Sequence, residues 1–378
     1  MSCETLPRVL FVWDQFGPYH MDRCEAVGKA LAGRARVVGI ELSAVSLTYA
    51  WDVTGNGRHF EKHTLFGSKP TETLPVADVA RALVHAVTRP DVRAVFFSGY
   101  ERPSHFLAAL AARACGRRAV VMLDSKYDDK PRRAALEAMK RLLMFPYSGG
   151  FAAGGRSADY LRFLGLQRRP ITTGYDTVSL DRIRALAAGT TPQPWPARPF
   201  VAVARYVPKK NLAFLLHAYA RFRRIDPTSR RRLILCGGGP LEGELRATAA
   251  ELGLLDWVDF TGFVGQAEVA LHLANAVCLL LPSIEEQWGL VVNEALAFAL
   301  PVILATNVGA IDLLAVENGN AFIHAPTDHD GWARAMMAIG SEPSTWQRMT
   351  AQSAALAPLG DVGEFVSGVL PHLPFATD

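Results

Sequence analysis

Two series of alternating strands and helices, joined by a proline-rich segment, constrain the fold of this chain more than any other feature. The first series starts with an apolar strand over residues 8–13, and the second with a strand over 200–204. Such alternation indicates parallel sheets with helices on both faces. In residues 187–199, prolines alternate with other residues, which favours an extended linker. We therefore expect an α/β protein with two Rossmann-like domains whose parallel sheets face a central cleft.

The individual elements follow from apolar periodicity and from turn residues. In the first half we expect strands over 8–13, 35–40, 92–98, 119–123 and 150–153. The expected helices of the first half cover 21–31, 77–88, 104–115, 129–143 and 157–164. In the second half we expect strands over 200–204, 232–236, 258–260, 276–281 and 302–305. The helices between and after them cover 212–224, 242–252, 267–274, 290–298 and 330–339. No element is predicted for residues 44–70.

The composition is that of an ordinary globular protein. Of the 378 residues, 50% are hydrophobic and 20% are charged, and the formal net charge is +4. This balance fits an anionic substrate or an acidic membrane surface and does not by itself indicate nucleic-acid binding. The five cysteines are scattered, as expected for free thiols in a reducing compartment. We find no signal-peptide pattern and no apolar run of about 18 residues, so a cytoplasmic protein is expected.

The loop after strand 200–204 carries two cations. Arg205 and Lys210 lie in Ala-Arg-Tyr-Val-Pro-Lys-Lys-Asn, between this strand and the next helix. Both side chains can clamp a diphosphate at this strand end. A basic loop on a solvated surface is the alternative interpretation.

Three glycines and a proline follow the strand over 232–236. Because Gly237, Gly238 and Gly239 lack side chains, their backbone can approach a ligand closely. A tight turn between a strand and a helix would require the same residues, and this interpretation also stays open.

Two glutamates with seven residues between them follow the strand over 276–281. Glu286 lies in the loop, and Glu294 lies in a helix that begins after Gly289. The N–H groups at a helix start suit a diphosphate, and two carboxylates can accept hydrogen bonds from hydroxyls of a sugar and a ribose. Two acids near a helix start are common. Together with the two preceding loops, at the strand ends where α/β sheets bind ligands, they predict a nucleotide-sugar site.

From about residue 200 to 345 the chain resembles the carboxyl-terminal domain of retaining glycosyltransferases of the GT-B fold, family 4. The motifs that carry the resemblance are Arg205 with a lysine five residues later, the Gly-Gly-Gly-Pro loop, and Glu286 and Glu294 at the family's spacing, followed by Leu-Pro-Val. The first half matches this family by architecture and only weakly by motif.

The resemblance implies a role for each residue. Arg205 and Lys210 would neutralise the donor diphosphate and the charge that develops as it leaves. Glu286 would hold hydroxyls of the donor sugar, and Glu294 would hold the ribose. The family needs no catalytic metal, because the two cations and the helix dipole take over that task.

The backbone around the donor is implied in the same way. The amides of Gly289, Leu290 and Val291 would meet the phosphates, and Gly238 belongs to the donor loop. Alanine stands at 204 and at 299, where the family usually has glycine. Both changes are small, and they affect how closely the backbone can approach the donor.

Two loops of the first half are candidates for the acceptor side. Gly17 and His20 lie in the loop after the first strand, which in this fold closes over the diphosphate and borders the acceptor. A lone histidine is more often structural. Many relatives carry a histidine after the strand that here covers 119–123, and Asp124 occupies this position. Asp124 can accept a hydrogen bond from the sugar or act as a base toward the acceptor, or it is an N-cap or loop aspartate.

The resemblance implies a hexosyltransferase that moves a sugar from a nucleotide-diphosphate sugar to an acceptor hydroxyl, with retention and with no metal or cofactor. Residues 1–186, with a returning helix at about 360–373, would bind a small-molecule, saccharide or lipid-linked acceptor, and 198–350 would bind the donor. Two alternatives are a sugar-nucleotide epimerase of the same fold and a non-catalytic nucleotide-sugar binding protein. A nicotinamide dehydrogenase is disfavoured, because no G-x-G-x-x-G follows either first strand.

The expected helix over 129–143 bears on location. Its basic and apolar residues interleave: Arg132, Arg133, Lys140 and Arg141 with Leu136, Met139, Leu142 and Leu143. The pattern fits an amphipathic helix at an anionic surface, which would place the cytoplasmic chain peripherally at the inner membrane face. An ordinary amphipathic helix packed on the sheet is the favoured alternative.

Overall fold

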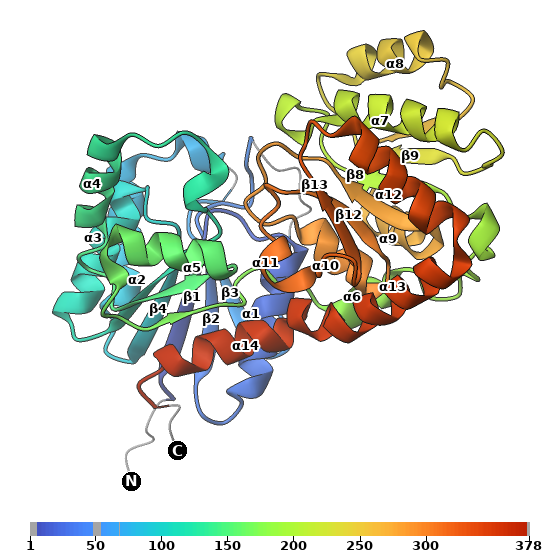
Figure 1. Cartoon of the computed structure of the whole chain (residues 1–378). Helices are drawn as coiled ribbons and strands as arrows, with labels where there is room; N and C mark the ends of the chain where they lie inside the picture. The colour runs from blue at the N-terminus through green and yellow to red at the C-terminus, as the bar shows by residue number, and fades with distance from the viewer. Residues whose placement is uncertain (1–5, 48–53, 68, 376–378) are drawn as a thin grey trace. The chain divides into compact units, whose positions relative to one another are not determined.

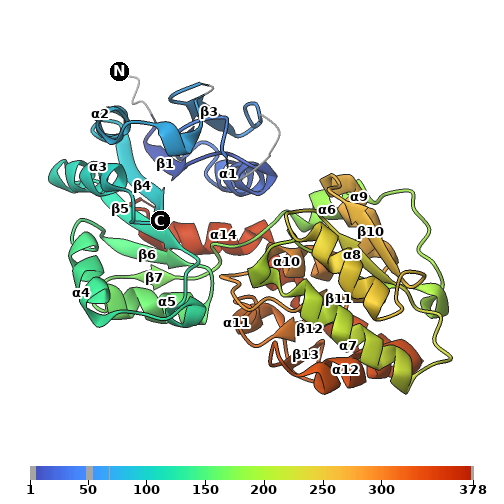
Figure 2. The same ribbon diagram turned by 90° about the horizontal axis from the view of Figure 1, so that it is seen from above.

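The computed structural model describes residues 6–47, 54–67 and 69–375, and its chain folds into two compact units (Figures 1 and 2). Unit 1 holds the residues up to Tyr127, Pro131–Ser179 and those from Val362 onward, and unit 2 holds Asp128–Lys130 and Leu180–Asp361. The chain therefore passes between the units mainly at 179/180 and 361/362. From the sequence we expected the first domain to end at 186 and the second to span 198–350. Residues 180–186 form a helix of unit 2, α6 (Leu180–Leu186), which packs against other helices of that unit.

Unit 1 is built on a seven-stranded sheet in which all neighbours are parallel. The strand order is β3-β2-β1-β4-β5-β6-β7. The strands are β1 (Arg8–Trp13), β2 (Arg36–Glu41), β3 (Phe60–Thr64), β4 (Val92–Ser98), β5 (Arg118–Leu123), β6 (Gly149–Ala152) and β7 (Ile171–Thr172). Parallel neighbours need crossover connections, so their carboxyl ends all lie at one edge of the sheet.

Helices cover both faces of this sheet, and each face has its own core. In the central strand β1, Val9 and Phe11 belong to one apolar cluster, whereas Leu10 and Val12 belong to the other. The helices of unit 1 are α1 (Pro18–Ala30), α2 (Val76–Val87), α3 (Pro103–Ala114), α4 (Ala134–Leu143), α5 (Gly155–Leu161) and α14 (Val362–Val369). Helices α1 and α14 supply the first cluster, and α2, α3 and α5 supply the second. Both faces are therefore apolar, as parallel strands require.

The chain end returns to unit 1 through α14. Phe365 of this helix is fully buried, and its ring centroid lies 5.7 Å from that of Phe11 and 4.9 Å from that of Phe151. Helix α14 also packs against α1. Residues far apart in the sequence thus complete one core.

Unit 2 repeats the same architecture with six parallel strands in the order β10-β9-β8-β11-β12-β13. The strands are β8 (Phe200–Val203), β9 (Leu233–Cys236), β10 (Val258–Gly262), β11 (Cys278–Leu281), β12 (Val302–Ala305) and β13 (Ala321–His324). The chain leaves β8 toward β9 and β10, and then returns to the other side of β8 with β11. Loops on both sides of this switch in direction meet at the carboxyl edge beside β8.

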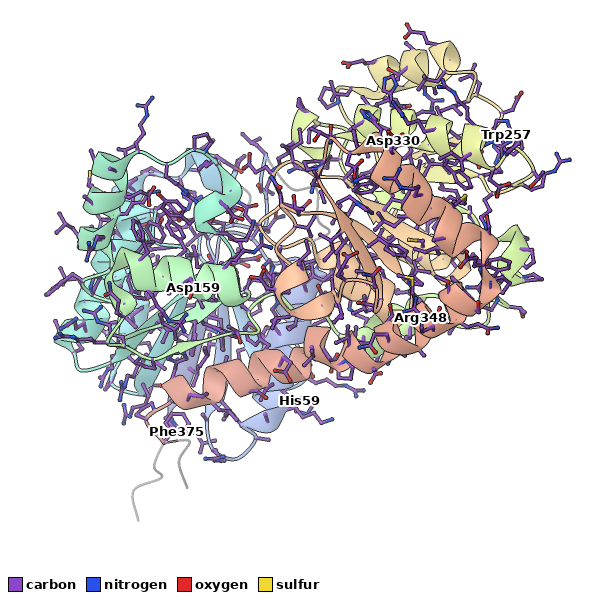
Figure 3. The ribbon with its side chains drawn as sticks, in the orientation of Figure 1. His59, Asp159, Trp257, Asp330, Arg348 and Phe375 are labelled. Atoms are coloured by element: carbon purple, nitrogen blue, oxygen red, sulfur yellow. The ribbon has the colours of Figure 1, made fainter. Side chains whose placement is uncertain are left out.

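The helices of unit 2 also form two layers. Besides α6 they are α7 (Leu212–Ile225), α8 (Glu242–Glu251), α9 (Gln266–Asn275), α10 (Leu290–Ala297), α11 (Ile311–Leu314), α12 (His329–Ser341) and α13 (Pro343–Leu356). Helix α7 packs against α8 and α12, whereas α10 packs against α6, α9 and α13. Asp330 at the start of α12 forms an exposed ion pair with Arg221 of α7 (Figure 3).

Most expected elements are present, and the differences have local causes. The edge strands β3, β7 and β13 were not predicted, because they are short or partly polar. The helix expected over 129–143 begins only at Ala134, because Pro131 disfavours a helical residue before it and Arg133 is extended. Every helix among the described residues is too short or too polar to span a bilayer.

Replacing Phe365 by alanine tests the contribution of α14 to unit 1. Removing a fully buried phenylalanine side chain should lower the free energy of unfolding by about 3–5 kcal/mol, measured by urea denaturation. Ser367→Ala, on the exposed side of the same helix, should change it by less than about 0.5 kcal/mol. Equal effects of the two substitutions would contradict the packing of α14 described above.

Candidate functional site

Four loops gather at the carboxyl edge of the sheet in unit 2. They follow β8, β9, β10 and β11, and among the residues predicted for the donor they carry Arg205, Lys210, Gly238, Glu286 and Gly289. Because the strands are parallel neighbours, residues that are distant in the sequence are placed at one edge. The candidate site is therefore located here.

The glycine loop after β9 packs directly against the loop that carries Arg205. The amide of Tyr206 donates to the carbonyl oxygen of Gly238 (2.8 Å), and the amide of Ala204 donates to that of Cys236 (3.0 Å). Gly237 has φ +135°, and a Cβ there would overlap the carbonyl oxygen of Ala204. The backbones of the two loops are therefore too close for a side chain at Gly237.

Gly239 is restricted in the same way. Its φ is +155°, and a Cβ at this position would lie 2.6 Å from the carbonyl oxygen of Tyr206. Gly238 differs, because its φ is not positive and a Cβ would lie 3.6 Å from the amide of Phe263. Gly237 and Gly239 therefore fit the alternative interpretation of a tight turn, because they shape the Arg205 loop. Gly238 leaves room for a Cβ, which would be in ordinary contact with Phe263.

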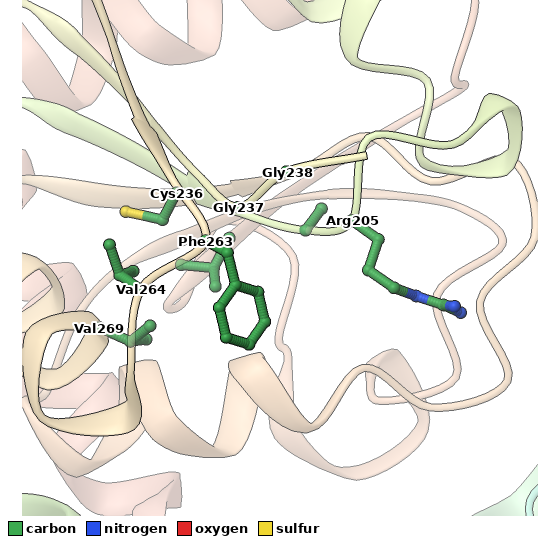
Figure 4. A pocket seen from close by; sticks show the side chains of 9 residues that line it. Arg205, Cys236, Gly237, Gly238, Phe263, Val264 and Val269 are labelled. Carbon is green, nitrogen blue, oxygen red and sulfur yellow. The ribbon is translucent and has the colours of Figure 1, made fainter. Parts of the chain in front are cut away.

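An apolar pocket of about 190 Å³ lies beside these loops. Its lining residues are Val203, Ala204, Arg205, Cys236, Gly237, Gly238, Phe263, Val264 and Val269. Figure 4 shows Phe263 at the pocket with the valines beside it, and Arg205 extending away from these apolar side chains. Phe263 is 79% exposed, which is unusual for a phenylalanine. An exposed aromatic ring next to an arginine suits a flat, charged ligand.

Lys210 and Glu286 form an ion pair between the loops after β8 and β11. The Lys210 ammonium contacts Oε2 of Glu286, and the side chains are only 14% and 13% exposed. The hydroxyl of Ser283 donates to the same carboxylate oxygen over 2.9 Å. The sequence identified the two charged residues and missed Ser283, which follows β11 directly and could have been found by its place at the strand end.

Helix α10 begins at this edge of the sheet. Gly289 precedes it with φ +99°, and a Cβ there would lie 3.0 Å from Leu281 and 3.4 Å from both Glu286 and Val308. The N–H groups of Leu290 and Val291 belong to the first turn, where a helix offers them no internal acceptor. A helix start of this kind attracts anions.

The loop after β12 fixes the loop that carries Glu286. The amide of Gly309 donates to the carbonyl oxygen of Glu286 (3.2 Å), and the amide of Ala310 donates to that of Trp288 (2.9 Å). A Cβ at Gly309 would overlap the carbonyl oxygen of Gln287. Sequence analysis missed Gly309, although a glycine after an apolar strand is a signal for close backbone approach.

Glu294 is located deeper than Glu286. It lies one turn into α10, and its residue is only 6% exposed. A carboxylate in this position is held by the protein and can present an acceptor oxygen to few groups. The predicted pair of glutamates therefore has two different environments.

The remaining predicted residues lie at the carboxyl edge of the sheet in unit 1. Gly17 is the N-cap residue of α1, and its amide donates to Nδ1 of His20 over 2.9 Å. Burial, with the positive charge of Arg23, lowers the pKa of His20 well below its usual value. His20 is therefore neutral near pH 7, with its proton on Nε2. The hydrogen bond that Nδ1 accepts from Gly17 is a structural role, as a lone histidine often has.

Asp124 directly follows β5 in unit 1. Its main-chain carbonyl accepts a hydrogen bond from the hydroxyl of Ser157 in α5 (2.8 Å). Asp14, after β1, was not singled out from the sequence; its carboxylate accepts from Nη2 and Nε of Arg102, at 2.7 and 3.1 Å. The loops after β1, β4 and β5 thus bring charged groups to one edge of this sheet.

Comparison with known proteins adds two findings. Residues 196–355, which all lie in unit 2, match the family described as glycosyl transferases group 1. The chain is 34% identical over 161 residues to a D-inositol 3-phosphate glycosyltransferase of Streptomyces griseus, which is 40% of this chain and 34% of that protein. The chain spans less than half the length of the curated relatives that it matches.

Solved structures resemble the chain over nearly its whole length. A glycosyltransferase from Rickettsia africae has a TM-score of 0.72 at 12% identity and covers 97% of both chains. HepE from Anabaena in complex with UDP has a TM-score of 0.69 at 17% identity, over 96% of this chain and 98% of that one. At such identities the likeness shows the fold alone, and it confirms the GT-B fold expected from the sequence.

The contact between the glycine loop and the Arg205 loop predicts different tolerance at neighbouring positions. Gly237→Ala combines a positive φ with a backbone clash, so it should lower the free energy of unfolding by roughly 2 kcal/mol or more in urea denaturation. Gly238→Ala is the matched control and should cost less than about 0.5 kcal/mol. If both alanines were tolerated equally, Gly237 would not be held by this contact.

Proposed function

We propose that this protein is a metal-independent glycosyltransferase that moves a sugar from a nucleotide-diphosphate sugar to an acceptor hydroxyl with retention of configuration. The observation that carries the proposal is the Lys210–Glu286 ion pair beside the start of α10, in loops next to the Arg205 pocket. At one sheet edge, the two cations and the helix start match the diphosphate of such a donor, and the carboxylate matches its sugar hydroxyls.

The donor would lie along this edge with its base in the apolar pocket. Phe263 offers an exposed ring face for a flat base, and Val203 and Val269 complete the apolar wall. The diphosphate would follow past Arg205 toward the N–H groups of Leu290 and Val291. Glu294 would take the ribose hydroxyls, because it is buried behind the helix start.

Lys210 would act on the phosphate that leaves. Ser283 fixes the Glu286 carboxylate, and Glu286 holds the lysine ammonium in place, so little motion is needed before it meets the diphosphate. Glu286 would also accept hydrogen bonds from hydroxyls of the donor sugar. Arg205 and Lys210 together offset the charge that develops in the transition state.

The proposed step needs no reactant other than the donor and the acceptor. The acceptor oxygen bonds to the anomeric carbon on the face from which the diphosphate departs, and the bond from that carbon to the phosphate oxygen breaks. The acceptor proton passes to the departing phosphate oxygen. The products are the glycosylated acceptor, with retained configuration, and a nucleoside diphosphate; no metal or cofactor takes part.

Unit 1 would bind the acceptor, which is a small molecule, a saccharide or a lipid-linked sugar. Gly17, His20 and Asp124 occupy the sheet edge there, with Nε2 of His20 as a hydrogen-bond donor and Asp124 as an acceptor or a base. The name of the Streptomyces griseus relative contains D-inositol 3-phosphate, so this compound is the first acceptor to test. We infer a cytoplasmic location, which the free thiols of the four described cysteines support.

Arg205→Ala tests the donor site. In a thermal-shift panel of UDP-, GDP-, ADP- and dTDP-sugars, one donor should stabilise the wild-type protein, by about 2.7 kcal/mol at a hundredfold excess over Kd. The substitution should remove most of this shift and lower transfer roughly 100- to 1,000-fold. Arg221→Ala removes an exposed arginine of the same unit and should change neither quantity. No shift with any donor would refute the donor site, and a shift without turnover would indicate a binding protein.

Chelation tests the proposed independence from metals. With excess EDTA, both the donor-induced shift and the rate of transfer should stay within a factor of about 2, because cationic side chains and the helix start replace the metal. A loss of transfer that added Mg²⁺ or Mn²⁺ restores would contradict this proposal. Formation of an epimeric nucleotide sugar without acceptor would instead identify an epimerase.

A further inference from the structure

Helix α4 buries a glutamate and leaves three of its large apolar side chains exposed. Glu137 is 3% exposed, whereas Leu142 is 72%, Met139 55% and Leu136 46% exposed. A helix on a globular protein normally buries its apolar side. Leu143 packs against the core of unit 1, as expected for an ordinary amphipathic helix on the sheet, but the other three large apolar side chains of α4 do not.

A buried polar network explains this orientation. The hydroxyl of Tyr160 donates to Glu137 over 2.7 Å, and the Lys140 ammonium donates to the same carboxylate over 2.7 Å. The guanidinium of Arg132 lies 4.6 Å from the ring centroid of Tyr160. Turning the helix so that its leucines face inward would break these hydrogen bonds and leave the buried Tyr160 hydroxyl without its carboxylate acceptor.

The outward apolar side continues beyond the helix. Phe145 follows α4 and is 56% exposed, and Phe163 is 45% exposed in the segment Arg162–Leu166, which packs against α4. We call the surface of Leu136, Met139, Leu142, Phe145 and Phe163 the α4 face. An exposed apolar cluster of this kind marks a contact surface.

The α4 face has a cationic rim. Five exposed arginines lie on or next to the elements that carry the α4 face: Arg113 on α3, Arg133 and Arg141 at the two ends of α4, and Arg162 and Arg168 in and after the segment Arg162–Leu166. The guanidinium of Arg113 donates to the carbonyl of Phe145 (2.6 Å) and lies 4.8 Å from its ring centroid, which places it at the border of the face. On α4 and on Arg162–Leu166 the only carboxylate is the buried Glu137. Asp159 of α5 (Figure 3) is paired with Arg162.

We propose that the α4 face is a docking surface for an anionic lipid bilayer. Leucine, methionine and phenylalanine side chains would enter the boundary between headgroups and acyl chains, while the arginines contact lipid phosphates. The charge of the rim decides between a bilayer and a second copy of this chain, since two copies would bring arginine against arginine. The inference goes beyond the proposed transfer reaction and does not depend on it.

Vesicle flotation of the whole chain tests the proposal. The wild-type protein should float with vesicles of equal parts phosphatidylcholine and phosphatidylglycerol, and not with phosphatidylcholine alone. Leu142→Glu should weaken this binding roughly tenfold or more, because it places a charge on the inserted side. Arg133→Ala and Arg141→Ala should each weaken it about fivefold, and added salt should weaken it further.

Leu255→Glu is the matched control. Leu255 is 58% exposed and lies in unit 2, so its substitution should leave binding unchanged. Leu142 is on the surface, so Leu142→Glu should keep the wild-type melting temperature, and lost binding then cannot be ascribed to unfolding. Absence of wild-type binding to the mixed vesicles, or equal behaviour of Leu142→Glu and Leu255→Glu, would overturn the proposal. A concentration-dependent dimer abolished by Leu142→Glu would assign the α4 face to a second copy instead.

Discussion

Parallel pairing of every strand in both sheets determines where the chemical groups of this protein are located. Parallel neighbours place their carboxyl ends at one edge, and each return to the sheet adds a loop there. In unit 2 the order β10-β9-β8-β11 joins four such loops on both sides of β8. Arg205, Gly238, Phe263 and Glu286 are brought to one edge in this way, although long stretches of sequence separate them.

Within that edge, contacts of backbone with backbone set the shape of the site. Gly237 and Gly239 hold the loop of Arg205, and Gly309 holds the loop of Glu286, at distances where a Cβ would collide with a carbonyl oxygen. The polar side chains then complete the arrangement, because Ser283 and Glu286 fix the Lys210 ammonium before any ligand arrives. A site built in this way is ordered in advance, which lowers the reorganisation that binding and reaction require.

In unit 1, buried polar groups orient a helix instead of forming a site for a ligand. Glu137, Lys140 and Tyr160 form hydrogen bonds inside the protein and turn the leucines of α4 to the surface. One network therefore explains both a buried carboxylate and an exposed apolar face. The same unit depends on α14 for the core that contains Val9 and Phe11, so residues 362–369 are part of the support for the loops after β1 and β5.

Local patterns in the amino-acid sequence predict the alternation of strands and helices, the loops at the strand ends, and Arg205, Lys210 and Glu286 as charged groups in those loops. These are local properties, since apolar periodicity and glycine-rich turns act over a few residues. These patterns do not reveal that Gly237 supports a neighbouring loop, that Ser283 donates to the carboxylate of the ion pair, or that α4 buries its glutamate and exposes two of its leucines. Ser283 is close to Glu286 in the sequence, but the ion pair of Glu286 with Lys210 and the contacts of Gly237 and Glu137 depend on partners far away in the sequence. The choice of partner is a property of the packed chain.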